Sequence, residues 1–277
     1  MSEVQPFPKT LHIGIIGAGV MGTALAKGMI SAGLIEANQL FASVGTQRGV
    51  DRVQQELGIP VAVGYKQEWI AQTNVYLICT KPYRVEIALE ELRASGVLRD
   101  DALFISVAAG LPLAKMEAIL PDHAIVRSMP NTPSLIGAGA TVIAAGTHAA
   151  VEDMACASNI FNSVGRTFEL PEHHMNAVTA VSGSGPAYIY LMMEALADGA
   201  VKVGLPRDVA FQLVSQTMLG AAQMLQQTGK HPATLKDEVT TPAGCTISAL
   251  LTMEDGKMRS TLARAVEEAT RTAAGLG

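Results

Sequence analysis

The sequence has few charged and few aromatic residues and no excess of basic charge. Of its 277 residues, 16% are charged and 4% are aromatic, and the formal net charge is −5. The absence of a basic stretch argues against a nucleic-acid-binding surface. Apolar residues make up 49% of the chain, which is more than a soluble monomer needs. We therefore expect buried interfaces between subunits.

Cysteine is also scarce, and no targeting or membrane-spanning pattern is visible. Cys79, Cys156 and Cys245 are scattered along the chain, and the six histidines show no ligand spacing. This excludes a disulfide framework and predicts no metal site. The N-terminal residues resemble neither a signal peptide nor a transit peptide, and no apolar run is long enough for a membrane span. These absences predict a cytoplasmic protein without membrane association.

A glycine-rich motif follows the first apolar stretch. Residues 12–16 read as a short buried strand, and Gly17, Gly19 and Gly22 form G-x-G-x-x-G before an amphipathic helix. In this context the motif predicts a dinucleotide site, because its glycines permit a tight turn, approach of the pyrophosphate and close helix packing. The intervening Val20 and Met21 are included among the predicted cofactor-binding residues.

The end of the second strand, near residues 39–44, lacks the acidic residue that holds the ribose of NAD. Ser43, Thr46 and Arg48 stand there instead and could contact a 2′-phosphate. This favours NADPH as cofactor, with NADH possible. The alternative is that Arg48 simply begins an exposed helix.

Three further strand ends add candidate cofactor residues. Strands are predicted over 74–80, 101–107 and 123–128. Because open α/β sheets bind ligands at the carboxyl ends of their strands, the residues that close these strands are expected in the cofactor crevice. They are Thr80, Lys81, Pro82, Ala108, Ala109, Gly110 and Asn131. The alternative for the first two strand ends is a simple turn.

The alternation of strands and helices predicts an α/β fold with a doubly wound, mainly parallel, Rossmann-like sheet over residues 1–170. After residue 170 the strand signals stop, and residues 171–277 predict an all-helical domain, with one helix over 173–181. The helix after Pro186 has a narrow polar stripe and is otherwise apolar. Such a helix is buried on most sides, so we expect a partner subunit to cover it.

The stretch VTTPAGCTIS, residues 239–248, predicts a turn that opens onto a helix. The N–H groups at a helix N-terminus have no helical partner and lie at the positive end of the helix dipole. They suit a small anion such as a carboxylate, and Thr246 adds a hydroxyl. An ordinary helix N-cap is the alternative. A dinucleotide site together with an anion site suggests a redox enzyme that acts on a small acid.

Nearly end to end, the chain resembles the pyrroline-5-carboxylate reductase family. The resemblance rests on IGIIGAGVMG at 13–22, TKP at 80–82, SVAAG at 106–110 and MPNTP at 129–133. The most specific parts are AVSGSGPAYIYLMMEALADGAVKVGLPR at 180–207 and GKHPATLKDEVTTPAGCTISAL at 229–250. Ala243 departs from the glycine that is common in the family, and Cys245 from threonine or alanine. Lys257-Met258 replaces a common glycine-phenylalanine pair.

The resemblance implies NAD(P)H-dependent reduction of 1-pyrroline-5-carboxylate to L-proline, the last step of proline biosynthesis. It implies homodimers with interlocking helical domains, which assemble into larger rings such as decamers. It further implies that Ala243, Gly244 and Cys245 bind the substrate carboxylate through backbone N–H groups and that Thr246 contacts the ring nitrogen and acts in catalysis. Ser182 and Ser184 would lie near the substrate.

Neither candidate substrate loop contains a histidine or a carboxylate. A cyclic imine can be protonated before it binds, so holding it beside the nicotinamide would suffice for catalysis. One alternative is a related imine or 2-hydroxyacid reductase with a lysine proton donor, for which Lys202, Lys230 and Lys236 are candidates. Another is a dimer that senses NADPH without redox chemistry.

Overall fold

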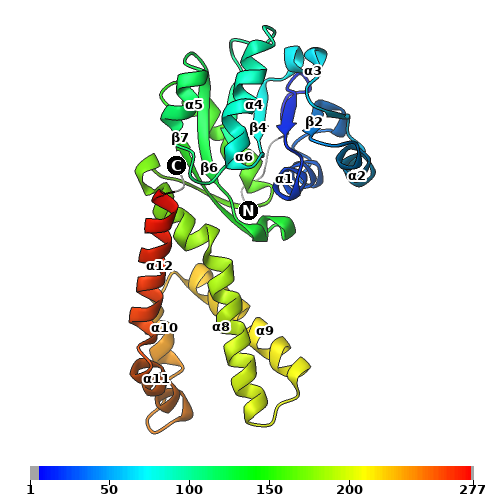
Figure 1. Ribbon diagram of the computed structural model, residues 1–277. Coiled ribbons are helices and arrows are strands. Elements are labelled where there is room, and N and C mark those ends of the chain that lie inside the picture. Colours follow the sequence, from blue (N-terminus) through cyan, green and yellow to red (C-terminus); the bar gives the residue numbers. More distant parts are fainter. Residues whose placement is uncertain (1–5, 276–277) are drawn as a thin grey trace. The chain divides into compact units, whose positions relative to one another are not determined.

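The computed structural model describes residues 6–275 (Figure 1). The chain forms two compact units. One contains the residues up to Ser184 together with those from Ala269 onward, and the other contains Gly185–Glu268.

The first unit is built on one eight-stranded sheet with the strand order β3-β2-β1-β4-β5-β6-β7-β8. Only β6 and β7 pair antiparallel. The strands are β1 (Ile13–Ile16), β2 (Leu40–Val44), β3 (Val61–Val63), β4 (Val75–Ile78), β5 (Leu103–Ser106), β6 (Ala124–Met129), β7 (Gly139–Ala145) and β8 (Gly165–Glu169). The predicted Rossmann-like, mainly parallel sheet is confirmed.

Helices cover both faces of this sheet. They are α1 (Val20–Ser31), α2 (Gln47–Leu57), α3 (Gln67–Gln72), α4 (Pro82–Ala94), α5 (Leu113–Ile119), α6 (Val151–Asn162) and α7 (Met175–Val178). Short 3₁₀ turns are η1 (Ala37–Gln39), η2 (Thr132–Ile136) and η3 (Glu172–His174), and η4 (Thr179–Gly183) is a π-helix. The sequence analysis did not predict β3 or α3, because they are short and lack a clear hydrophobic period.

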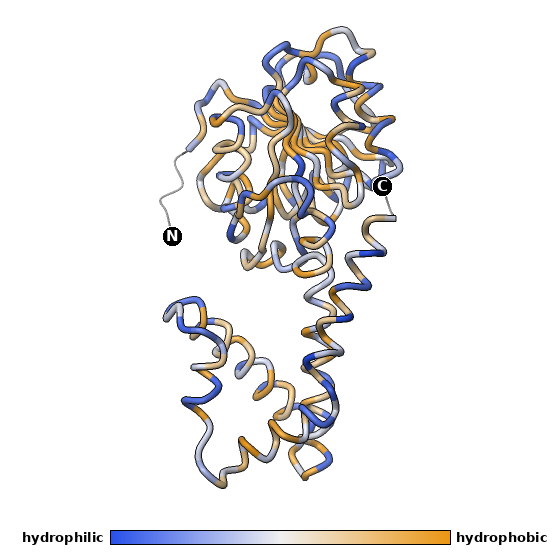
Figure 2. Tube along the Cα trace, turned by 90° about the vertical axis from the view of Figure 1, so that its left-hand side faces the viewer, coloured by the Kyte–Doolittle hydropathy of each residue, from blue (hydrophilic) through white to orange (hydrophobic). Residues whose placement is uncertain are grey.

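Successive residues of the central strands face opposite sides of the sheet. Ile13 and Ile15 of β1 belong to a core cluster that includes residues of α1 and α6, whereas Ile16 belongs to a second cluster with residues of α4 and α5. The strands are therefore apolar on both faces, as is typical of parallel sheets between two helical layers. Figure 2 shows these strands as the most hydrophobic part of the chain.

The helical segment after β8 packs on the sheet as a third, smaller cluster. Met175 and Val178 contact the buried Val142 and Ala144 of β7. The single helix predicted over 173–181 is instead divided into η3, α7 and the π-helix η4. The reason is that the N–H of Ser184 donates to the carbonyl oxygen of Thr179 at 2.8 Å, which widens the turn to five residues.

The second unit is entirely helical. It contains α8 (Gly185–Lys202), α9 (Arg207–Thr228), α10 (Pro232–Glu238), α11 (Cys245–Asp255) and the greater part of α12 (Met258–Ala274). Helices α8 and α9 pack against each other and are joined by a short turn (Figure 1). Among residues 185–268, all of which the structure describes, only Ala197 and Ala210 are buried. This unit therefore has no large core of its own.

Candidate active site

The glycine-rich loop between β1 and α1 is held by its own backbone. Gly17 has a φ of +90°, which favours glycine. The N–H groups of Gly17 and Ala18 both donate to the carbonyl oxygen of Ser43, at 3.0 and 3.1 Å, and Gly19 N–H donates to the Gly17 carbonyl at 2.7 Å. These three N–H groups are engaged within the fold. Ser43 thus supports the loop through its backbone.

The first turn of α1 leaves the N–H groups that suit a phosphate. Val20, Met21 and Gly22 are the first three residues of this helix, so their N–H groups have no helical acceptor. A Cβ on Gly19 would have no atom within 4 Å, whereas one on Gly22 would lie 2.9 Å from Ile15 Cγ2 and 3.0 Å from the Gly17 carbonyl oxygen. Gly19 therefore leaves open space beside the loop, and Gly22 packs closely on β1.

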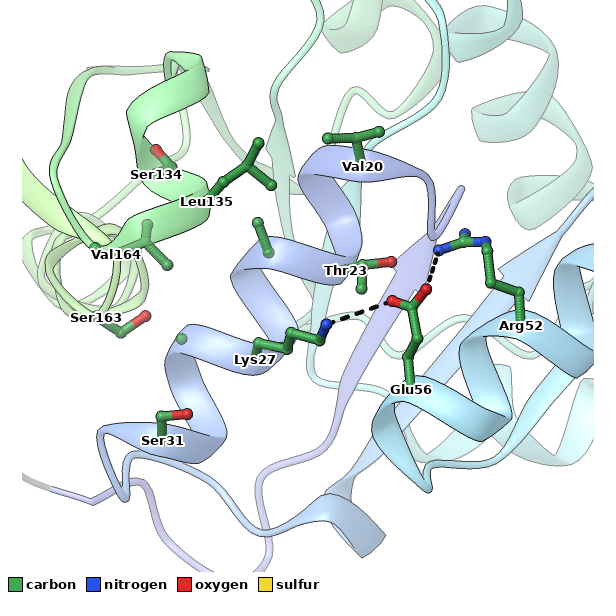
Figure 3. Close-up of a pocket in the computed structure, with 13 residues that line it drawn as sticks. Val20, Thr23, Lys27, Ser31, Arg52, Glu56, Ser134, Leu135, Ser163 and Val164 are labelled. Atoms are coloured by element: carbon green, nitrogen blue, oxygen red, sulfur yellow. Dashed lines mark hydrogen bonds and ion pairs between the residues drawn. The ribbon is translucent and has the colours of Figure 1, made fainter. Parts of the chain in front are cut away.

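An arginine that the sequence analysis did not single out also holds this loop. Arg52 of α2 donates from Nη2 to the carbonyl oxygen of Ala18 at 2.6 Å. Glu56 lies between two cations, 3.4 Å from Arg52 Nη1 and 3.5 Å from Lys27 Nζ (Figure 3). The only sequence signal was the Arg52–Glu56 spacing on one helical face. That spacing gives no hint of the Ala18 contact.

A pocket of about 440 Å³ runs beside α1 and is bordered by η2, the end of α6 and α2 (Figure 3). Its lining includes Lys27, Arg52, Glu56 and the buried Ser134. Of the predicted cofactor residues, only Val20 lines it. The pocket is therefore distinct from the crevice that the strand ends predict.

The residues after β2 present one hydroxyl group and one cation, whereas the predicted Ser43 is buried. Thr46 is the N-cap of α2, and its side-chain oxygen accepts from Gly49 N–H at 3.2 Å. Arg48 lies in the first turn of α2 and is exposed. No carboxylate stands between Ser43 and Arg48. The helical and the cofactor interpretations of Arg48 are compatible, since it begins a helix and leaves its guanidinium accessible.

The ends of β4 and β5 supply the remaining candidate residues beside the glycine-rich loop. A Cβ on Gly17 would lie 2.9 Å from Thr80 Cγ2, so Thr80 contacts the loop, and Thr80 Oγ1 is buried without a hydrogen-bond partner among the described residues. Lys81 and Pro82 begin α4, and Ala108, Ala109 and Gly110 follow β5. Burial raises the pKa of the neighbouring Cys79 thiol to about 12. The Cys79 thiol is therefore neutral near pH 7.

Asn131 joins the loop after β6 to the π-helix. Its Nδ2 donates to the carbonyl oxygen of Ser182 at 3.1 Å, and its Oδ1 accepts from Ala140 N–H at 2.9 Å. The Ser182 hydroxyl donates to the Val178 carbonyl at 3.0 Å. The structure thus brings together two residues that the sequence analysis had assigned to separate ligands.

The anion loop lies in the second unit. Gly244 is the N-cap of α11, and the N–H groups of Cys245, Thr246 and Ile247 begin that helix without helical acceptors. No acidic residue occurs in its first turn. Ala243 has a φ of +56°, a left-handed conformation that costs a non-glycine residue roughly 1–2 kcal/mol. The loop keeps the backbone that glycine would favour.

Two of the three lysines considered as proton donors are held in exposed ion pairs. Lys230 Nζ lies 2.5 Å from Glu238 Oε1, and Lys236 Nζ lies 2.5 Å from Asp237 Oδ1. Lys202, at the end of α8, is exposed.

Residues 6–275 contain no cluster of three or more potential metal-ligating side chains. Within the same residues, no helix is long and apolar enough to cross a membrane.

Known proteins match the chain along nearly its whole length. The family described as pyrroline-5-carboxylate reductase dimerisation matches residues 172–276, and NADP oxidoreductase coenzyme F420-dependent matches residues 12–110. A pyrroline-5-carboxylate reductase from Arabidopsis thaliana is 39% identical over 97% of this chain and 97% of its own length. The chain belongs to the pyrroline-5-carboxylate reductase family. The resemblance seen in its motifs is confirmed, and so is its assignment as an oxidoreductase.

Solved structures of family members have the same fold as this chain. A pyrroline-5-carboxylate reductase from Coxiella burnetii superposes with a TM-score of 0.90 at 31% identity, covering 97% of this chain and 99% of that chain. The Plasmodium falciparum enzyme, solved with NADP bound, gives a TM-score of 0.86 at 30% identity, covering 98% of this chain and 100% of that chain. The fold of a Rossmann-like domain followed by a helical dimerisation domain is thus shared with this family.

Proposed function

We propose that this chain reduces 1-pyrroline-5-carboxylate to L-proline with NADPH, the final step of proline biosynthesis. The observation that carries the proposal is the match to family members over 97% of both chains, with an oxidoreductase match in the N-terminal part and a dimerisation match in the C-terminal part. Bound NADPH would supply a hydride to the imine carbon. The C=N π electrons would pass to the ring nitrogen, which carries the proton already bound to the imine, and NADP⁺ would be the second product.

The proposed cofactor contacts follow from the geometry of the first unit. The N–H groups of Val20, Met21 and Gly22 would bind the pyrophosphate, with Gly17 and Gly19 shaping the loop. Arg48 and Thr46 would bind the 2′-phosphate, which supports NADPH over NADH. Thr80, Lys81, Pro82, Ala108, Ala109 and Gly110 would complete the crevice at the ends of β4 and β5.

The proposed substrate contacts lie at the start of α11. The N–H groups around Gly244 and Cys245 would bind the substrate carboxylate at the positive end of the helix dipole. The Thr246 hydroxyl, for which no hydrogen bond is found among the described residues, would orient the ring nitrogen. Since the imine can arrive protonated, this arrangement needs no strong general acid.

The family model that matches residues 172–276 is described as a dimerisation domain, which supports association between copies of the chain. We propose a homodimer, which can assemble further into rings such as decamers. The support is the second unit's own surface, where Leu191 is 66% exposed, Leu213 is 52% exposed and Leu251 is 59% exposed. Leaving so many large apolar side chains in water is unfavourable. Light scattering after size exclusion would give the mass, and a stable monomer at micromolar concentration would contradict the proposal.

The proposed location is the cytoplasm, supported by three cysteines that are all free in the structure and suit a reducing compartment. Cell fractionation with an antibody to the protein would test it. Recovery of the protein from an organelle fraction alone would contradict this location.

The decisive test of function is NADPH absorbance at steady state with 1-pyrroline-5-carboxylate, repeated with NADH, and with proline identified as the product. Substrate-dependent oxidation that yields proline would support the proposal. NADPH that binds but is never consumed would overturn it. The ratio of the two cofactors' kcat/KM values tests the assignment of Arg48 and Thr46 separately from the reaction.

A further inference from the structure

Both polar atoms of the Asn131 side chain form hydrogen bonds within the protein. Its Oδ1 accepts from the N–H of Ala140, at 2.9 Å, and its Nδ2 donates to the carbonyl oxygen of Ser182, at 3.1 Å. Asn131 follows β6 and Ser182 lies in η4, 51 positions later in the chain. A side chain whose oxygen and nitrogen are both engaged in this way is poorly suited to bind a cofactor, which is the role that its sequence position suggests.

The acceptor of this bond is a carbonyl that the helix cannot satisfy. In a continuing helix the N–H of the residue four positions later would donate to the Ser182 carbonyl. That residue is Pro186, which has no N–H. A partly buried carbonyl without a donor costs free energy, and Asn131 provides the missing donor.

The surrounding contacts hold the two segments in close register. A Cβ built on Gly183 would lie 2.5 Å from Met129 Cε, the mobile end of that side chain, so η4 lies directly against the end of β6. Ser184 N–H closes the π-turn on Thr179 at 2.8 Å, and the Ser182 hydroxyl is engaged by Val178. The Ser184 hydroxyl makes no hydrogen bond within the part of the chain that the structure describes. It is therefore the serine hydroxyl left available to a substrate.

We propose that Asn131 is a positioning residue that holds the Ser182–Ser184 segment at the carboxyl end of β6, rather than a ligand of the cofactor. This inference rests on the proposed function. Open α/β sheets bind their ligands at that end of the strands, so the bond fixes a substrate-facing serine beside the expected nicotinamide site. Positional errors of about 1 Å in such a group reduce turnover by about a hundredfold.

Asn131→Asp replaces the Nδ2 donor by an acceptor. The carboxylate keeps an acceptor for Ala140 N–H but turns an oxygen toward the Ser182 carbonyl. The matched control is Asn162→Asp, because Asn162 Oδ1 likewise accepts a backbone N–H, that of Thr167 at 3.0 Å, and makes no bond to Ser182. We expect Asn131→Asp to lower kcat by about tenfold or more, the factor that corresponds to one lost hydrogen bond. We expect the control to change kcat by less than about twofold.

Hydrogen exchange gives a readout that does not depend on turnover. The amides of residues 179–185 should exchange about tenfold faster in Asn131→Asp, because local opening becomes easier, while those of residues 49–57 should not change. Pro186→Ala restores an N–H four residues after Ser182. In that background Asn131→Asp should have a smaller effect on exchange. This non-additivity would show that both groups act on the same carbonyl.

Different outcomes would refute the positioning role of Asn131 and the proposed reaction. Asn131→Ala, which adds no charge, should leave the NADPH Kd within about twofold of the wild-type value. A rise of about tenfold in that Kd, with unchanged exchange over 179–185, would make Asn131 a cofactor ligand and overturn the inference. Wild-type protein that does not oxidise NADPH with the imine would refute the proposed function. The exchange comparison would still decide the role of Asn131 as the donor to Ser182.

Discussion

Gly244 lies so close to Thr241 that a Cβ built on it would be 2.4 Å from Thr241 Oγ1 and 3.1 Å from the Thr241 carbonyl oxygen. Gly244 N–H also donates to that carbonyl, at 3.1 Å. The turn before α11 is therefore closed by a backbone hydrogen bond, and the Thr241 hydroxyl occupies the space that a side chain at position 244 would need. The requirement for glycine arises from this contact, since the φ of −76° at Gly244 is open to any residue.

Gly244→Ala should therefore displace the turn that precedes the proposed carboxylate site. We expect KM for 1-pyrroline-5-carboxylate to rise by about tenfold or more, the effect of about 1.4 kcal/mol of lost binding free energy. The NADPH Kd should be unchanged, because the proposed cofactor contacts lie in the first unit. Steady-state kinetics and a fluorescence titration with NADPH would measure the two quantities. An equal rise in KM for the imine and in the NADPH Kd would contradict the assignment of this loop to the substrate.

Ala243 and Lys257 offer a matched pair, because both have a φ of +56°. Glycine adopts this conformation without the Cβ clash, so Ala243→Gly and Lys257→Gly should each stabilise the protein by up to about 1 kcal/mol. For a protein of this size that corresponds to a rise in Tm of about 2–4 °C. Only Ala243→Gly should also change KM for the imine. A change in KM of the same size in Lys257→Gly would remove the special role of the Ala243 turn.

Arg48 and Arg52 lie one turn apart on α2 and should affect the cofactor differently. Arg48→Gln removes the proposed partner of the 2′-phosphate, so KM for NADPH should rise by about tenfold while KM for NADH stays nearly constant. Arg52→Gln removes the hydrogen bond to the Ala18 carbonyl. It should therefore weaken the binding of NADPH and of NADH to a similar extent. The measurement is kcat/KM for each cofactor at constant ionic strength. An NADPH-selective loss in Arg52→Gln would reverse the two assignments.

Glu172 is the partner of a buried cation. Arg127 Nη1 donates to Glu172 Oε1 at 2.8 Å, the Arg127 side chain is 8% exposed, and the same carboxylate oxygen accepts from Leu113 N–H at 2.6 Å. Glu172→Ala leaves this cation unpaired and should reduce the free energy of unfolding by about 3 kcal/mol. Glu172→Gln keeps a hydrogen-bond acceptor for Arg127 and should reduce the free energy of unfolding by less. Urea titrations at one protein concentration would show whether the two variants differ as expected.

The thiols of two partly buried cysteines, Cys79 and Cys156, predict that stability depends on pH in the alkaline range. Burial raises the pKa of Cys79 from 9.0 to about 12, and burial together with the charge of Asp153 does the same for Cys156. Below pH 9 both thiols are neutral in the folded and unfolded chains. Above it, only the unfolded chain ionises, so stability should fall as pH rises toward 12, by up to about 1.4 kcal/mol per pH unit and thiol. In the variant Cys79→Ala/Cys156→Ala, the free energy of unfolding from urea titrations should fall less steeply with pH between about pH 9 and 11 than in the wild type. An identical dependence on pH would contradict the assignment.

The sequence by itself determined the order of the elements and the family. Short continuous apolar runs marked the central strands, and apolar residues with a helical period marked the long helices, because such patterns report burial directly. The G-x-G-x-x-G motif and the TTPAG turn were recognisable because glycine and proline restrict the backbone locally. The half-exposed edge strand β3 was missed, since its three residues depend on pairing with β2.

The tertiary structure decided which polar groups meet. Nothing local in the sequence relates Asn131 to Ser182, Arg52 to the Ala18 carbonyl or Arg127 to Glu172, because each bond joins segments at least 34 positions apart. Hydrogen bonds act over about 3 Å, so their partners are fixed only when the sheet and helices are packed. Composition indicated which chemistry was available. The fold determined which of these groups are occupied by the protein and which remain free for a ligand.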